Sequence, residues 1–134
     1  MSETETDATV TLLVVEDETL LLHELKIALE DAGFQVRDAS NGRDSMAAIE
    51  TENEAIKALI TDVNLGNSPS GWDLGHAARE RNPGLPVIYV SGGAESDWAV
   101  KGVPKSVFIA KPHAAVQVVV AVSSLMNADG DTAA

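Results

Sequence analysis

The sequence predicts an α/β fold in which five parallel strands form one doubly wound sheet with helices on both faces. Five short β-type runs alternate with segments of helical periodicity along the 134 residues. The first run, residues 10–15, is almost continuously apolar, which is typical of a strand buried on both faces. Parallel neighbours need crossover connections, and right-handed crossovers place helices on both sides of the sheet.

Strands and helices are expected in strict alternation. We expect strands at residues 10–15, 34–38, 56–61, 86–90 and 106–110, and helices at residues 17–32, 42–52, 71–81, 95–101 and about 113–126. The first helix has leucines and alanines at helical spacing and stops at Gly33, which suits the left-handed position after a helix. The helix at residues 95–101 has room for two turns at most.

The chain has the size of one domain, at 134 residues and 14.0 kDa. Residues 1–9 are small, polar and acidic, and we expect a flexible lead there. Residues 10–127 form the predicted domain, and residues 128–134 are expected to be a flexible tail. Because the sequence ends just after the last predicted helix, we expect a stand-alone domain without an output module.

Composition excludes several classes of function. The net charge is −12, from 9 basic and 21 acidic residues, so the chain should repel nucleic acids and anionic membranes. The absence of cysteine excludes disulfides and thiolate metal sites. No basic and apolar leader opens the sequence, and its longest apolar stretch is too short to span a bilayer. We therefore expect a cytoplasmic protein with no nucleic-acid or membrane partner.

Chemically active side chains follow four of the five predicted strands. Glu16 and Asp17 follow the first strand, Asp62 the third, Ser91 the fourth and Lys111 the fifth. In open parallel sheets ligands bind outside the carboxyl ends of the strands. The sequence therefore predicts that three acids, one hydroxyl and one ammonium meet at the same edge.

Such a group of acids needs positive charge nearby. Two carboxylates about 4 Å apart repel by roughly 4 kcal/mol at an effective dielectric constant of 20. Lys111 offsets part of this charge, and a hard cation such as Mg²⁺ (or Mn²⁺) offsets the rest, with the backbone carbonyl of Asn64 as a further ligand. Asp62, on the middle strand, is then placed to attack phosphorus and form an acyl phosphate.

The ordered set of motifs resembles the receiver domain of bacterial two-component response regulators. The matching segments are residues 14–17, 60–65, 86–92 and 108–112, and the resemblance covers residues 10–127. It implies a flavodoxin-like fold and phosphorylation of Asp62 by a sensor histidine kinase or a histidine phosphotransfer protein.

The resemblance also implies a role for individual residues. Glu16 and Asp17 would hold Mg²⁺, Ser91 and Lys111 would contact the phosphoryl oxygens, and Phe108 would be the rotating switch aromatic. The bond between Lys111 and Pro112 would be cis.

The sequence departs from the family pattern at several positions. Glu16 replaces the commoner aspartate, and Gly92-Gly93 follows Ser91, where the family usually has alanine first. His113 replaces the usual apolar residue after Lys-Pro. The helix at residues 95–101 is short, which alters the usual output surface.

Two apolar segments indicate contacts with other proteins. A helix cannot bury Leu20, Leu21 and Leu22 on one face, so at least one should be exposed beside the acid pair, where a phosphohistidine partner would dock, with His113 as a further contact. The last helix is apolar nearly all round, which favours a homodimer or a downstream protein target.

Each feature also has a plainer interpretation. An acid pair after a strand often caps a helix, Ser91 suits a turn, Phe108 suits core packing, and a single exposed leucine is common. Two other functions also remain open. An aspartate-based phosphohydrolase uses similar chemistry but normally has Asp-x-Asp on its first strand and a cap. A receiver fold that binds partners without phosphorylation would not need the acid set.

Overall fold

The computed structural model describes residues 10–133 apart from residue 53 and residues 67–68, 94 and 112–114, with side chains up to Met126. The predictions for His113 and for the Lys111–Pro112 bond lie outside the described residues.

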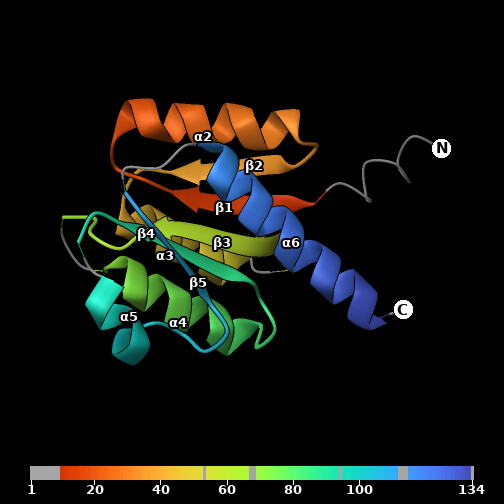
Figure 1. Cartoon of the computed structure of the whole chain (residues 1–134). Coiled ribbons are helices and arrows are strands. Elements are labelled where there is room, and N and C mark those ends of the chain that lie inside the picture. The colour runs from red at the N-terminus through yellow and green to blue at the C-terminus, as the bar shows by residue number, and fades with distance from the viewer. Residues whose placement is uncertain (1–9, 53, 67–68, 94, 112–114, 134) are drawn as a thin grey trace.

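One parallel sheet of order β2-β1-β3-β4-β5 forms the centre of the molecule (Figure 1). The elements in chain order are β1 (Thr11–Val15), α2 (Thr19–Asp31), β2 (Gln35–Ala39), α3 (Gly42–Glu52), β3 (Ile56–Asp62), α4 (Gly71–Arg81), β4 (Val87–Ser91), α5 (Glu95–Lys101), β5 (Val107–Ala110) and α6 (Ala115–Ala133). The predicted doubly wound fold is confirmed. The strand order reverses between β1 and β3, which is where such sheets bind their ligands.

The predicted elements are all present, and α3, α4 and α5 have the predicted bounds. Most other boundaries differ from the prediction by one or two residues, as expected for fraying ends. Helix α6 is the exception, since it runs to Ala133 past the predicted end near residue 126. It includes most of the segment expected to be a flexible tail, whose flexibility stays a prediction.

The core consists of two apolar layers, one on each face of the sheet, because alternate strand residues point to opposite faces. Helices α2 and α6 cover one face, where Leu25, Leu29, Val118 and Val122 are buried together. Helices α3 and α4 cover the other face, with Leu74 among the buried residues. Strands β1, β3 and β4 are buried on both faces, which explains their nearly continuous apolar sequences.

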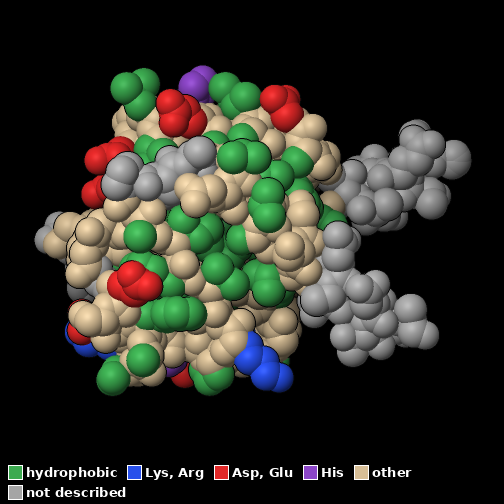
Figure 2. Space-filling view, viewed as in Figure 1, with side chains coloured by type: hydrophobic (Ala, Val, Ile, Leu, Met, Phe, Trp, Pro, Cys, Tyr) green, Lys and Arg blue, Asp and Glu red, His purple; other side chains and the backbone are tan. Residues whose placement is uncertain are grey.

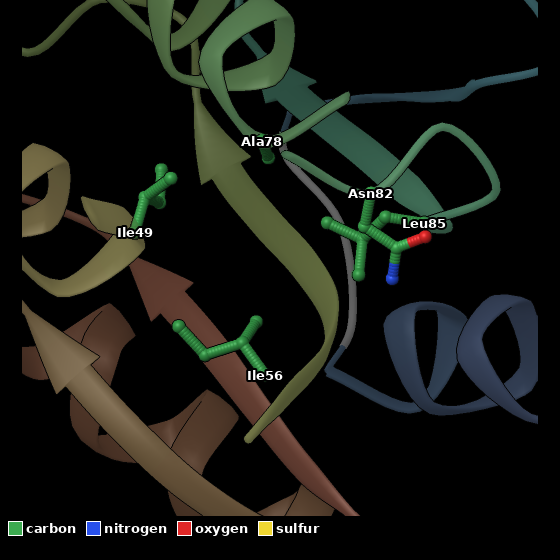
Figure 3. A pocket seen from close by; sticks show the side chains of 5 residues that line it. All are labelled: Ile49, Ile56, Ala78, Asn82 and Leu85. Carbon is green, nitrogen blue, oxygen red and sulfur yellow. The ribbon is translucent and has the colours of Figure 1, made fainter. Parts of the chain in front are cut away.

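A small apolar recess lies at the edge of the sheet opposite the carboxyl ends of the strands, where β3 begins and α4 ends (Figure 3). It is lined by Ile49, Ile56, Ala78, Asn82 and Leu85. Its volume of about 10 Å³ barely accommodates one water molecule, so it is a packing defect and not a ligand site. Among the described helices, none has the length and apolar character needed to cross a bilayer.

Candidate functional site

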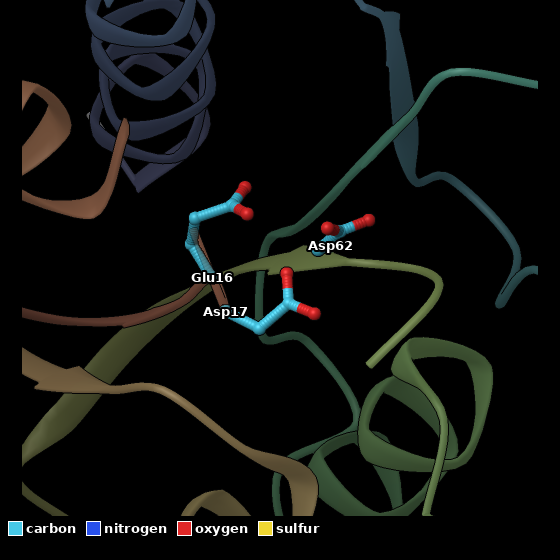
Figure 4. Close-up of side chains that lie close together, drawn as sticks. All are labelled: Glu16, Asp17 and Asp62. Carbon is cyan, nitrogen blue, oxygen red and sulfur yellow. The ribbon is translucent and has the colours of Figure 1, made fainter. Parts of the chain in front are cut away.

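The site residues come from the ends of four strands that are consecutive in the sheet. Glu16 and Asp17 follow β1, Asp62 and Ser91 are the last residues of β3 and β4, and Lys111 follows β5. Figure 4 shows how the carboxylates of Glu16, Asp17 and Asp62 gather at the ends of β1 and β3. The fold therefore brings these residues to one edge of the sheet, as the sequence predicted.

The three carboxylates form a compact group. One oxygen from each of Glu16, Asp17 and Asp62 lies within 4.8 Å of the others. Glu16 is 1% exposed and Asp62 6% exposed, whereas Asp17 is open to solvent. An all-oxygen set that is buried on one side and open on the other suits Mg²⁺, which binds through a few carboxylates and keeps several waters.

Lys111 supplies positive charge inside this group. Its Nζ lies 3.0 Å from Asp62 Oδ2 and 3.2 Å from Glu16 Oε1. Burial opposes the charge of Lys111, but the hydrogen bond to Asp62 and the charges of Asp62 and Glu16 outweigh it, so the pKa of Lys111 is raised. The Lys111 backbone N–H also donates to the Ser91 carbonyl oxygen at 2.8 Å, which ties the end of β5 to β4.

Both the side chain and the backbone of Glu16 make hydrogen bonds. Its Oε2 accepts from the Glu18 N–H at 3.0 Å, at the start of α2, and its own N–H donates to the Ala39 carbonyl oxygen at 3.1 Å. Burial raises the pKa of Glu16 to about 7, and the charge of Asp62 adds to the rise, against the opposing effects of Glu18 and Lys111. A cation bound here would favour the ionised form, so binding should release a proton.

Both carboxylate oxygens of Asp62 have partners. Oδ1 accepts from the Asn64 N–H at 3.2 Å, and Oδ2 accepts from Lys111. The same turn that makes the first of these bonds places the Asn64 peptide next to the Asp62 side chain. The use of the Asn64 carbonyl as a metal ligand stays a prediction.

Ser91 and Phe108 lie outside the carboxylate group. Ser91 is 1% exposed, and its Oγ accepts from the Gly93 N–H at 3.3 Å. The hydroxyl makes no hydrogen bond to the three carboxylates within the part of the chain that the structure describes. Phe108 is half-buried, and its ring centroid lies 5.8 Å from that of Trp98. The proposed switch roles of both residues stay predictions.

Sequence reasoning missed three residues that support this edge of the sheet. Tyr89 is fully buried, its hydroxyl accepts from the Val103 N–H at 3.1 Å, and burial raises its pKa. Thr61 and Gly71 contact the backbone of Asp62. A threonine inside an apolar strand and a glycine at the first position of a helix were the available signals.

Residues 12–123 match the family described as the response regulator receiver domain. This chain belongs to that family. Receiver domains are signalling domains of two-component systems that accept a phosphoryl group from histidine kinases and bind Mg²⁺ in their active site. The gathering of Glu16, Asp17 and Asp62 is compatible with both properties.

Curated relatives include whole transcriptional regulators. The chain is 30% identical over 125 residues to the probable transcriptional regulatory protein TcrX of Mycobacterium tuberculosis, covering 92% of this chain and 52% of TcrX. It is 31% identical over 120 residues to the transcriptional regulatory protein PhoP of Escherichia coli K12, covering 86% and 51%. The chain thus spans about half the length of these regulators.

Solved structures show the same fold. A response regulator receiver protein from Sinorhizobium medicae has a TM-score of 0.86 and 38% identity, with 90% of this chain and 97% of that one covered. The receiver domain of the sensor histidine kinase PA1611 from Pseudomonas aeruginosa, which has magnesium coordinated in its active site cleft, has a TM-score of 0.75 and covers 90% of this chain and 99% of its own. At 18% identity, the second likeness shows the fold alone.

Proposed function

We propose that this receiver domain accepts a phosphoryl group from a phosphohistidine onto Asp62. Its donor would be a sensor histidine kinase or a histidine phosphotransfer protein. The observation that carries the proposal is the position of Lys111, whose ammonium contacts both Asp62 and Glu16 inside a group of three acids. An ion pair that served stability alone would need one carboxylate, whereas Lys111 contacts two, and the third acid, Asp17, lies beside them.

Mg²⁺ (or Mn²⁺) would be held by Asp17, Asp62, the Asn64 carbonyl and, directly or through water, Glu16. When bound, it supplies positive charge for the carboxylates and for the phosphoryl oxygens. The exposed Asp17 leaves the group open on the side from which a hydrated ion arrives.

The transfer itself forms one bond and breaks one bond. A carboxylate oxygen of Asp62 attacks phosphorus in line, the bond from phosphorus to the imidazole nitrogen breaks, and the electron pair returns to the imidazole. Lys111 is placed to move from the Asp62 carboxylate to the phosphoryl oxygens and to neutralise their charge. Ser91 Oγ accepts from the Gly93 N–H, and its hydroxyl donates no hydrogen bond to the described residues, so it could donate to a phosphoryl oxygen.

We also propose that the domain signals through contacts with proteins. Leu20 is 80% exposed at the start of α2, close in sequence to Glu16 and Asp17, whereas Leu21 and Leu22 are half-buried. Leu20 is thus available to a partner that brings a phosphohistidine to Asp62. The phosphorylated domain would act on a protein target directly or pass the phosphoryl group on in a phosphorelay.

The surface of α6 favours a second contact. Val116 and Val120, one helical turn apart, are 60% and 58% exposed, and residues 115–126 contain no charged side chain. Figure 2 shows hydrophobic side chains spread across the face that α6 and β5 present, with few charges among them. This surface suits a second copy of the chain or a downstream target.

The direct test is incubation with a small acyl-phosphate donor and Mg²⁺, followed by mass mapping of the modified residue. We expect one phosphoryl group on Asp62, no labelling in Asp62→Asn, and slow loss of the label. Modification of another residue would contradict the proposal. Continuous turnover of a phosphomonoester would support a phosphohydrolase instead, and partner binding unchanged in Asp62→Ala would support phosphorylation-independent binding.

A further inference from the structure

The backbone that carries Asp62 is fixed from two sides by residues that do not touch the carboxylate group. The Asp62 carbonyl oxygen accepts from the Thr61 hydroxyl at 2.8 Å. The next carbonyl, that of Val63, accepts from the Gly71 N–H at 2.9 Å, while the Val63 N–H donates to the Val90 carbonyl oxygen at 3.0 Å. The Asn64 N–H donates to Asp62 Oδ1 as well, so Asp62, Val63 and Asn64 each have a polar group in a hydrogen bond.

Thr61 is an unusual residue for its position. It is fully buried in β3, and its register partners in the adjacent strands are Val15 and Tyr89. A valine of the same shape would suit this apolar layer, whereas a buried hydroxyl is costly unless it is hydrogen-bonded. Its hydrogen bond to the Asp62 carbonyl satisfies the hydroxyl and, at the same time, orients the peptide between Asp62 and Val63.

Gly71 contacts the same peptide from α4. A Cβ at this position would lie 2.1 Å from the Asp62 carbonyl oxygen and 2.7 Å from Val63 Cα. Gly71 is not among the residues with positive φ, so the need for glycine comes from space and not from backbone strain. Any side chain here would push the Asp62–Val63 peptide away from α4.

We propose that Thr61 and Gly71 are positioning residues for phosphoryl acceptance, which hold the Asp62–Val63 peptide so that the Asp62 carboxylate and the Asn64 carbonyl face one cation. The inference rests on the proposed function of Asp62. A rotation of this peptide would turn the Asp62 side chain and displace the Asn64 peptide together. Two ligands of the proposed Mg²⁺ site would then lose their common orientation, although neither residue had been changed.

The first test compares Thr61→Val with Thr61→Ser. Valine keeps the volume and removes the hydroxyl, whereas serine keeps the hydroxyl and removes a methyl group. We expect Thr61→Val to bind Mg²⁺ about fivefold more weakly by calorimetry, the effect of one hydrogen bond, and to be phosphorylated more slowly. Thr61→Ser should stay close to the wild type in both measurements even if it unfolds at a lower temperature.

A second comparison uses two glycines of the same helix. A Cβ at Gly71 would meet the Asp62 carbonyl oxygen at 2.1 Å, and a Cβ at Gly75 would meet the Tyr89 hydroxyl at the same distance. Both Gly71→Ala and Gly75→Ala should lower the unfolding temperature, but only Gly71→Ala should weaken Mg²⁺ binding. This pair decides the question if Thr61→Val does not fold.

A third readout needs neither metal nor phosphate. Because the Asn64 N–H donates to Asp62 Oδ1, the Asn64 amide resonance should shift in metal-free Thr61→Val and remain in place in Thr61→Ser. If Thr61→Val had the Mg²⁺ affinity, the phosphorylation rate and the Asn64 resonance of the wild type, the positioning role would be overturned. If the wild type itself neither bound Mg²⁺ nor was labelled on Asp62, the proposed function would fail instead, so the two failures are distinct.

Discussion

Glu16 shows how burial and charge compete at a single residue. Its carboxyl is almost fully buried, and burial raises its pKa to about 7. The neighbouring Lys111 ammonium and Glu18 N–H favour the ionised form but do not outweigh the loss of water. In the family, an aspartate is commoner at this position, and the longer side chain of glutamate is what contacts both Lys111 and the start of α2.

This raised pKa predicts a pH-dependent stability. Without Mg²⁺, the unfolded chain loses the Glu16 proton near pH 4.5 while the folded chain keeps it to about pH 7, so the free energy of unfolding should fall across that interval. The Glu16 contribution to this fall is about 3 kcal/mol. Urea unfolding at several pH values measures it, and Glu16→Gln should remove that part of the slope.

Added Mg²⁺ should then stabilise the wild type more at pH 8 than at pH 5, because the ion binds the deprotonated acid group. Equal stabilisation at both pH values would contradict this account of Glu16.

Among the described helices, α5 is the one without a buried residue. Its Val100 is 85% exposed. Trp98 is its main attachment, since Nε1 donates to Ser106 Oγ at 2.8 Å and the ring lies against Phe108. The end of the helix is held by His76, whose Nε2 lies 2.8 Å from the Lys101 carbonyl oxygen. A segment with so few buried contacts is expected to open locally.

We expect Trp98→Ala to release α5 without unfolding the domain. Amide hydrogens of residues 95–101 should exchange much faster in this variant, whereas those of β1 and β3 should keep their protection. Trp98→Phe, which keeps an aromatic ring and loses the hydrogen bond to Ser106, should give an intermediate rate. Hydrogen exchange with mass spectrometry distinguishes these outcomes, and unchanged exchange in Trp98→Ala would show that other contacts hold the helix.

Leu20 at the start of α2 offers a test of partner docking. Leu20→Lys should leave the free energy of unfolding within about 0.5 kcal/mol of the wild type, because Leu20 is exposed. It should slow phosphotransfer from a phosphorylated histidine kinase that labels the wild type, and leave labelling by a small acyl-phosphate donor unchanged. Ile27→Lys, further along the same helix at 45% exposure, is the matched control. Equal kinetics in the two variants would exclude Leu20 from docking.

The net charge of the protein opposes self-association, whereas the apolar surface of α6 favours it. The net charge of −12 makes two copies repel, whereas residues 115–126 of α6 carry no charge and expose Val116 and Val120. Among the helices in the described part of the chain, α6 is therefore a favourable place for two copies to meet.

Self-association through α6 should strengthen with ionic strength, because salt screens the repulsion between copies and leaves apolar contact intact. Sedimentation equilibrium at low and high salt measures this effect. Val120→Lys should weaken association at both, and Ile27→Lys on α2 should leave it unchanged. A chain that stayed monomeric at high salt would favour a downstream target as the partner of this surface.

The alternation of strands and helices can be predicted from the sequence, and with it the edge at which Glu16, Asp17, Asp62 and Lys111 meet. Periodicity is a local property of the chain, and parallel strands place their carboxyl ends together whatever their exact packing. The continuous apolar runs in β1 and β4 likewise reported burial on both faces before any contact was known.

The contacts between individual atoms could not be predicted from the sequence and are known from the packed fold. The fold showed that Lys111 contacts both Asp62 and Glu16, that Gly71 lies against the Asp62 carbonyl, and that Tyr89 reaches Val103. These contacts join residues far apart in the chain, and their distances depend on how helices and strands pack. The burial of Glu16, and hence its raised pKa, also depends on tertiary packing, because desolvation is a property of the surroundings and not of the residue.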